Sequence, residues 1–95
     1  MKAVKTVLSP VQVPKQPVGA RYEWCINSAA VDPADDSVIV NSEAGTVYRW
    51  DLATNKLAEQ LHLNEPKTEA YTPTLIGPDG TVYAMNDATL YAIGR

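Results

Sequence analysis

Residues 37–51 read SVIVNSEAGTVYRWD and carry the clearest structural signal in the chain. They contain two short runs rich in β-branched and aromatic residues, which favour strands. The segment Glu43-Ala44-Gly45 between the runs is typical of a tight turn. Neither run places its apolar residues at helical spacing. The stretch therefore predicts a β-hairpin over residues 37–50, with its turn at 43–45.

A second hairpin is predicted further along the chain. Residues 75–94 read LIGPDGTVYAMNDATLYAIG. Turn-forming residues precede residue 81 and fill positions 86–88, so the hairpin is expected at residues 81–93. The consecutive apolar residues at 38–40 and 82–85 are typical of strands that are buried on both faces.

The two hairpins are copies of one sequence unit. Residues 30–51 align with residues 75–94, and three pairs of positions anchor the alignment at offsets of 45, 44 and 43: Pro33 with Pro78, Val38 with Val82, and Tyr48 with Tyr91. The offset changes only within turns, where single-residue deletions are tolerated because the backbone faces water. A period near 44 with several short strands and no amphipathic helix indicates β-propeller blades.

The predicted fold class is all-β, with two antiparallel blade-like sheets of a β-propeller. Three segments are expected: residues 1–27 as a proline-rich lead-in or edge segment, residues 28–64 as a first blade, and residues 65–95 as a second, incomplete blade. The second copy has no counterpart of the strand predicted at residues 56–63 (KLAEQLHL). Two blades cannot close a ring, so we expect either a piece of a larger propeller or a chain that associates with itself.

The first 27 residues differ from the repeats because Pro10, Pro14 and Pro17 remove donors that a strand ladder needs. Residues 10–14 are expected to form an edge strand or an extended linker, and residues 22–26 a strand that leads into the first hairpin. If the isolated chain does not self-associate, residues 4–13 are expected to serve as a substitute edge strand.

The segment at residues 45–57 (GTVYRWDLATNKL) resembles both the WD repeat and the repeat of pyrroloquinoline-quinone-like (PQQ-like) propellers. Residues 80–87 (GTVYAMND) with residues 89–94 (TLYAIG) are more similar to the PQQ-like form. The chain departs from that pattern at two positions, since Asn55 replaces a turn glycine and Glu59 stands where the family has a tryptophan that docks into the next blade. Asn tolerates left-handed backbone better than other non-glycine residues, so the turn at Asn55 is expected to survive.

Composition narrows the function classes. The net charge is −3 and the eight Lys and Arg residues are scattered, which argues against nucleic-acid binding. Cys25 is the single cysteine, so an internal disulfide and a cysteine zinc cluster are excluded. No stretch approaches the roughly 20 apolar residues of a membrane span.

No residue pattern predicts catalysis, a metal or a cofactor. His62 is alone and lies in no metal-binding motif. The serines, which include Ser9, Ser28, Ser37 and Ser42, have no nucleophile context, and Cys25 is expected to be a buried or half-buried thiol rather than a nucleophile. The turn aspartates are expected to cap their own backbone rather than to bind calcium: Asp32, Asp35, Asp36, Asp51 and Asp79. The aromatic residues are expected to pack between blades: Trp24, Trp50, Tyr48, Tyr83 and Tyr91.

The sequence thus favours a non-catalytic propeller segment that acts as a scaffold or binding surface within a larger protein. Its expected partners are the remaining blades or further copies of the chain. The resemblance leaves two alternatives. One is part of a PQQ-dependent dehydrogenase, in which residues from several blades hold the quinone and a calcium ion. The other is a glycan-binding or assembly propeller of the cell envelope, for which a periplasmic or extracellular location is implied.

Overall fold

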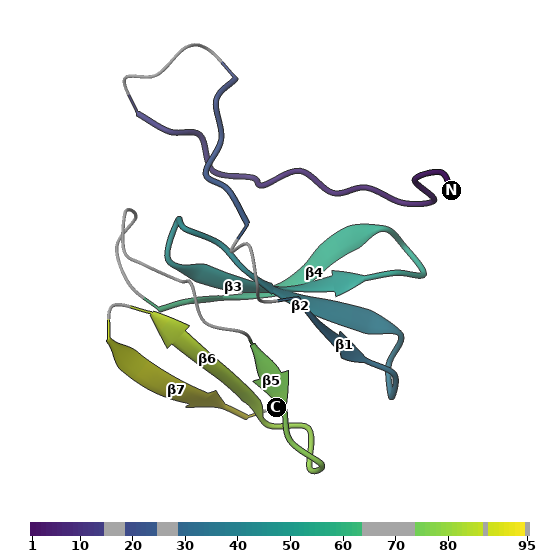
Figure 1. Ribbon diagram of the computed structural model, residues 1–95, viewed down its shortest axis with the longest axis vertical. Coiled ribbons are helices and arrows are strands. Elements are labelled where there is room, and N and C mark those ends of the chain that lie inside the picture. Colours follow the sequence, from purple (N-terminus) through teal and green to yellow (C-terminus); the bar gives the residue numbers. More distant parts are fainter. Residues whose placement is uncertain (15–18, 25–28, 64–73, 87, 95) are drawn as a thin grey trace.

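The computed structural model describes residues 1–14, 19–24, 29–63, 74–86 and 88–94 (Figure 1). It is all-β, with two antiparallel sheets and no helix among the described residues. The first sheet has the strand order β1 (Ala30–Asp32), β2 (Ser37–Asn41), β3 (Thr46–Asp51) and β4 (Lys56–His62). The second has the order β5 (Leu75–Ile76), β6 (Val82–Asn86) and β7 (Thr89–Ile93). The all-β prediction and both predicted hairpins are confirmed.

The turn between β3 and β4 forms as predicted despite the missing glycine. Asn55 adopts left-handed backbone with φ 57°, and its side-chain oxygen accepts a hydrogen bond of 3.0 Å from the Trp50 indole. The turn between β2 and β3 uses Gly45 at φ 85°. Ala88, in the turn between β6 and β7, also has a positive φ of 58° without the freedom of glycine.

The pairing registers of the two sheets follow the sequence repeat. A row of three cross-strand neighbours in the first sheet corresponds to a row in the second: Val31, Val38 and Trp50 correspond to Ile76, Val82 and Ile93. The next pair along the strands corresponds as well: Val40 with Tyr48, and Ala84 with Tyr91. The offsets found in the sequence are therefore also the offsets of the hydrogen-bonded ladders, and β1–β2–β3 is equivalent to β5–β6–β7.

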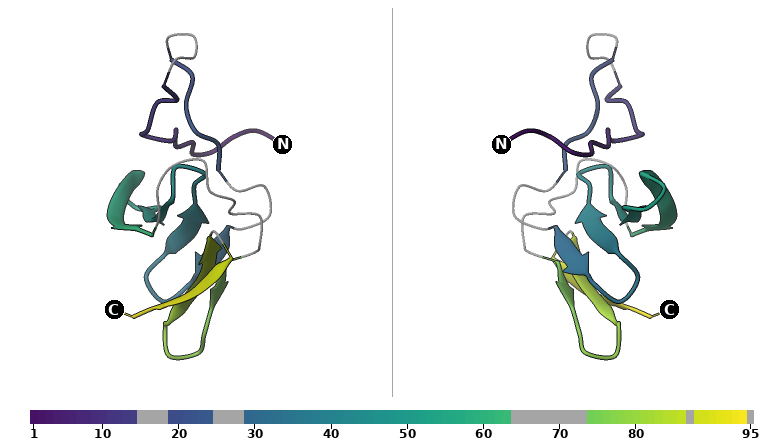
Figure 2. Two further views of the ribbon diagram at one scale, coloured as in Figure 1. Left: turned by 90° about the vertical axis from the view of Figure 1, so that its left-hand side faces the viewer. Right: turned by 90° about the vertical axis from the view of Figure 1, so that its right-hand side faces the viewer.

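The two sheets pack face to face, and the core lies between them (Figure 2). Its buried members come from both sheets: Ile39, Val47, Val82 and Ala84, with Ala30, Leu63, Ile76 and Ile93 packed against them. Between described residues, two side-chain hydrogen bonds also join the halves of the chain. The Asn41 side-chain amide donates to the Met85 carbonyl at 3.2 Å, and the Tyr91 hydroxyl donates to the Leu63 carbonyl at 3.3 Å.

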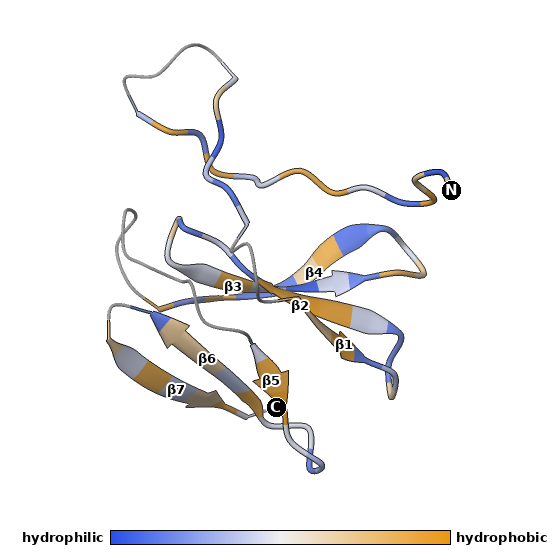
Figure 3. Ribbon diagram, viewed as in Figure 1, coloured by the Kyte–Doolittle hydropathy of each residue, from blue (hydrophilic) through white to orange (hydrophobic). Residues whose placement is uncertain are grey.

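The predicted burial on both faces is observed for β2 but not for β6. In β2, Ile39 and Val40 point to opposite faces and are both buried. In β6, Val82 and Ala84 are buried, but Tyr83 is 39% exposed because the face of the second sheet that points away from the core is open to solvent. In Figure 3, orange apolar positions run along β2 and β6, and the turn between β1 and β2 is blue. The expectation of two-sided burial for residues 82–85 is therefore wrong at Tyr83.

The described part of residues 1–24 lies beside the first sheet as an extended segment (Figure 1). It makes two isolated bridges, Gln12 with Arg21 and Trp24 with Ser42. The Trp24 ring meets the Tyr48 ring edge-on at 5.6 Å, and its indole donates to the Val7 carbonyl at 3.4 Å. Residues 4–13 add no strand to either sheet, which matches the extended-linker alternative and not the substitute edge strand. Of the strand predicted at 22–26, the described residues form only the bridge at Trp24, and residues 25–26 lie outside the described part.

Candidate functional site

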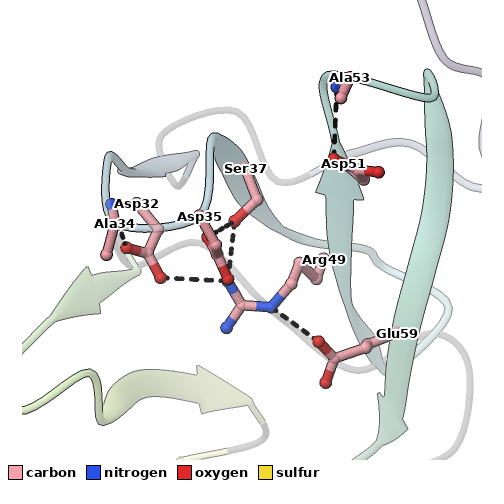
Figure 4. Close-up of polar contacts among 8 residues, drawn as sticks. All are labelled: Asp32, Ala34, Asp35, Ser37, Arg49, Asp51, Ala53 and Glu59. Atoms are coloured by element: carbon pink, nitrogen blue, oxygen red, sulfur yellow. Dashed lines mark hydrogen bonds and ion pairs between the residues drawn. The ribbon is translucent and has the colours of Figure 1, made fainter.

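The densest polar constellation in the described residues surrounds Arg49 (Figure 4). Its Nη1 donates to the Ser37 hydroxyl at 2.7 Å, to the Asp35 carboxylate at 2.9 Å and to the Asp32 carboxylate at 3.1 Å. Its Nε lies 3.1 Å from Glu59 Oε1. The Ser37 hydroxyl in turn donates to Asp35 at 2.6 Å. One guanidinium thus holds three carboxylates and a hydroxyl, and we call these five residues the Arg49 cluster.

Sheet register explains why these residues meet. Asp32 on β1 pairs with Ser37 on β2, and Arg49 on β3 pairs with Glu59 on β4. Directly opposed residues of antiparallel strands point to the same face, and Ser37 and Arg49 share that face with the core. The ladder between β3 and β4 shifts register just after Arg49, which marks a β-bulge or similar irregularity. Such irregularities redirect side chains locally.

Burial decides which of the ion pairs matters. The Asp32 side chain is 4% exposed and the Arg49 side chain 12%, so this pair lies away from water and its members depend on each other. The Glu59 side chain is 74% exposed, and water screens its pairing with Arg49. The Asp35 side chain is 35% exposed, so water also reaches its pairing with Arg49. The cluster therefore anchors the turn between β1 and β2 to the sheet, chiefly through Asp32.

Sequence reasoning missed the Arg49 cluster. It treated Asp32 and Asp35 as turn caps and did not assign Arg49 a partner. The available signal was the hairpin register, since pairing Arg49 opposite a glutamate on the strand at 56–63 would have placed opposite charges side by side. The sequence alone did not show how the strand at 56–63 pairs with the strand at 46–51, and the partner of Arg49 depends on that register.

The predicted capping by aspartates is confirmed at three turns. Asp32 accepts from the Ala34 amide at 3.2 Å, Asp51 from the Ala53 amide at 3.3 Å, and Asp79 from the Thr81 amide at 3.0 Å. The Thr54 hydroxyl also donates to Asp51 at 2.7 Å. This hydroxyl is the main cause that holds the pKa of Asp51 below its usual value, and the Thr81 amide is the main cause that lowers the pKa of Asp79.

Two hollows lie along the junction of the sheets. One of 240 Å³ is bordered by the Arg49 cluster on one side and by the second sheet on the other; its lining includes Ile39, Val47, Arg49, Glu59, Leu61, Val82 and Ile93. The other, of 420 Å³, lies between two turns that correspond in the repeat, at Asp32–Ala34 and at Gly77–Gly80. Both are formed by the packing of one sheet on the other, so their shape depends on that packing.

The other residues singled out in the sequence are not brought together. The Thr46 hydroxyl and His62 Nδ1 share a hydrogen bond of 3.1 Å at the end of the β3–β4 ladder. Ser42 caps the Ala44 amide at 3.1 Å, and Ser9 is buried in the N-terminal segment. Cys25 and Ser28 lie outside the described residues. Burial raises the pKa of the Tyr48 hydroxyl, and a hydrogen bond with Thr46 partly offsets that rise.

Within the described part of the chain, no group of three or more His, Cys, Asp or Glu side chains is arranged to hold a metal ion. The same residues contain no helix with the length and apolar character needed to cross a membrane. No protein-family model matches the sequence, and no match is found among curated proteins.

Proposed function

We propose that the chain is a non-catalytic, propeller-type repeat segment that acts as a scaffold or binding surface within a larger protein. One observation carries this proposal: the two equivalent sheets pack through faces that do not correspond to each other. The first sheet contributes Ile39 and Val47 to the core, and the second contributes Val82 and Ala84. By the register, the counterparts of Val82 and Ala84 are Val38 and Val40, which lie on the opposite face of the first sheet.

Packing of this kind is directional. Each unit offers one face forward and the other backward, as in repeat arrays whose units contact only their neighbours. A two-fold sandwich would instead bring the same face of each sheet together. The blade interpretation thus draws support from the packing as well as from the resemblance to PQQ-like repeats.

The polar and aromatic groups in the described residues also favour an architectural role. The Arg49 guanidinium is held by carboxylates of its own sheet. The Trp50 indole donates to Asn55 and the Trp24 indole to the Val7 carbonyl. These groups stabilise turns and the N-terminal segment, so a ligand would have to displace internal contacts to use them.

An experimental structure tests the proposal through the rotation that superposes residues 30–51 on residues 75–94. A ring of four to eight blades turns each blade by about 45–90° from the last, so we expect a rotation in that range. In a two-fold sandwich the second sheet would instead superpose on β2–β3–β4, with a rotation near 180°. That result would overturn the propeller interpretation. Absorbance titration with pyrroloquinoline quinone and Ca²⁺ tests the dehydrogenase alternative. We expect no saturable binding, and stoichiometric binding would replace the scaffold proposal.

A further inference from the structure

Each sheet has one face in the core and one outer face. The repeat makes the core face of one sheet equivalent to the outer face of the other. The core of the first sheet uses Ala30, Ile39 and Val47. By the register, their counterparts in the second sheet are Leu75, Tyr83 and Leu90. These side chains are 63%, 39% and 66% exposed. The outer face of the second sheet is therefore the equivalent of the core face of the first sheet. Both faces are apolar, but the face on the first sheet is covered by the second sheet, whereas its equivalent on the second sheet is exposed.

The same relation holds at the other end. The second sheet reaches the core through the row Ile76, Val82 and Ile93. Its counterpart in the first sheet is the row Val31, Val38 and Trp50, which lies on the outer face. Val31 is 68% exposed. In the next row along the strands, Val40 and Tyr48 of this face are already buried, at 8% and 2% exposure, and Trp24 packs edge-on against Tyr48. The exposed part of this face lies at its other end, at Val31.

We propose that the outer face of β5–β6–β7 is a docking surface for the exposed end, at Val31, of the outer face of β1–β2–β3 in a second copy of this chain. The contact would continue the interface that joins the two sheets within the chain, with Leu75, Tyr83 and Leu90 in the place of Ala30, Ile39 and Val47. The joined faces are different, so the association is head-to-tail and leaves one open face at each end of the pair. This inference rests on the proposed scaffold function and specifies the surface that it uses.

Two charge substitutions at exposed positions block the two faces separately. Leu90→Glu places a carboxylate on the outer face of the second sheet, and Val31→Glu places one on the outer face of the first. Burying an unpaired charge is strongly unfavourable, so each variant should lose association. Leu8→Glu is the matched control, because Leu8 is 69% exposed and belongs to neither sheet. Circular dichroism of each variant confirms that the sheets remain folded.

Sedimentation velocity over a wide concentration range supplies the readout. The unmodified chain and Leu8→Glu should show a sedimentation coefficient that rises with concentration. Leu90→Glu alone and Val31→Glu alone should each need at least tenfold higher protein concentration than the unmodified chain to reach the same degree of association. An equimolar mixture of the two should recover association and stop at a heterodimer, because one intact face remains on each partner.

Three results would overturn the inference: an unmodified chain that stays monomeric at every concentration, single variants that associate like the control, or a mixture as inert as its components. None of these alters the rotation between the two sheets within one chain. Loss of the docking surface and loss of the propeller interpretation are therefore distinguishable.

Discussion

Removal of the Arg49 guanidinium should destabilise the fold mainly through Asp32. In Arg49→Met the aliphatic part of the side chain is retained, but the Asp32 carboxylate, at 4% exposure, loses its cation. Removing one partner of a buried pair costs about 3–5 kcal/mol. The Ala34 amide still donates to Asp32, so we take the lower end, about 3 kcal/mol. That is a large fraction of the roughly 5–15 kcal/mol by which small domains are stable.

A pair of double-mutant cycles isolates the contribution of Asp32. Urea unfolding at pH 7, followed by tryptophan fluorescence, gives the free energy of unfolding for Arg49→Met, Asp32→Asn and the double variant. The coupling energy should exceed about 1.5 kcal/mol, because Asp32→Asn removes the charge that Arg49 compensates. The matched cycle with Glu59→Gln should give less than about 1 kcal/mol, because Glu59 is 74% exposed. Equal couplings, or a larger coupling to Glu59, would refute the argument from burial.

Two further predictions concern the turns and the response to pH. Ala88→Gly should stabilise the chain by about 0.5–1 kcal/mol, since it relieves a left-handed alanine at φ 58°, whereas Ala92→Gly in the middle of β7 should destabilise it; equal effects in thermal unfolding would contradict this. The pKa values of Asp51 and Asp79 are lowered in the fold, so their contribution is complete above the unfolded value of about 3.9 and is lost as pH falls through the folded values. The pKa of Tyr48 is raised by burial, so its contribution is lost as pH rises above about 10. Urea midpoints from pH 3 to 11 should fall at both extremes, and Tyr48→Phe should flatten the alkaline limb.

Local features of the fold followed from the sequence. Both hairpins, the left-handed Asn55 and the aspartate caps depend on residues close together in the chain, and turn chemistry reports such contacts. The repeat offsets also survived, because a shift of one residue would have turned every apolar side chain to the wrong face.

Features that depend on the placement of whole strands did not follow. The Arg49 cluster draws on residues from all four strands of the first sheet and the turn between β1 and β2, and its geometry depends on the register shift after Arg49. The exposure of Tyr83 depends on whether another layer covers β6. A strand that is buried on both faces and a strand with one apolar face exposed to solvent can have the same sequence pattern, so periodicity could not distinguish them.

The positions of the two tryptophans divide the chain into optically distinct halves. Trp50 lies in β3, and Trp24 packs on Tyr48 of the same strand. The aromatic residues of the second sheet are all tyrosines. Indole emission therefore reports on the first sheet and its N-terminal segment and is silent about β5–β7. If the halves unfold as one unit, indole emission and backbone circular dichroism will trace the same transition. If the second sheet detaches first, the circular dichroism will change while the emission stays constant.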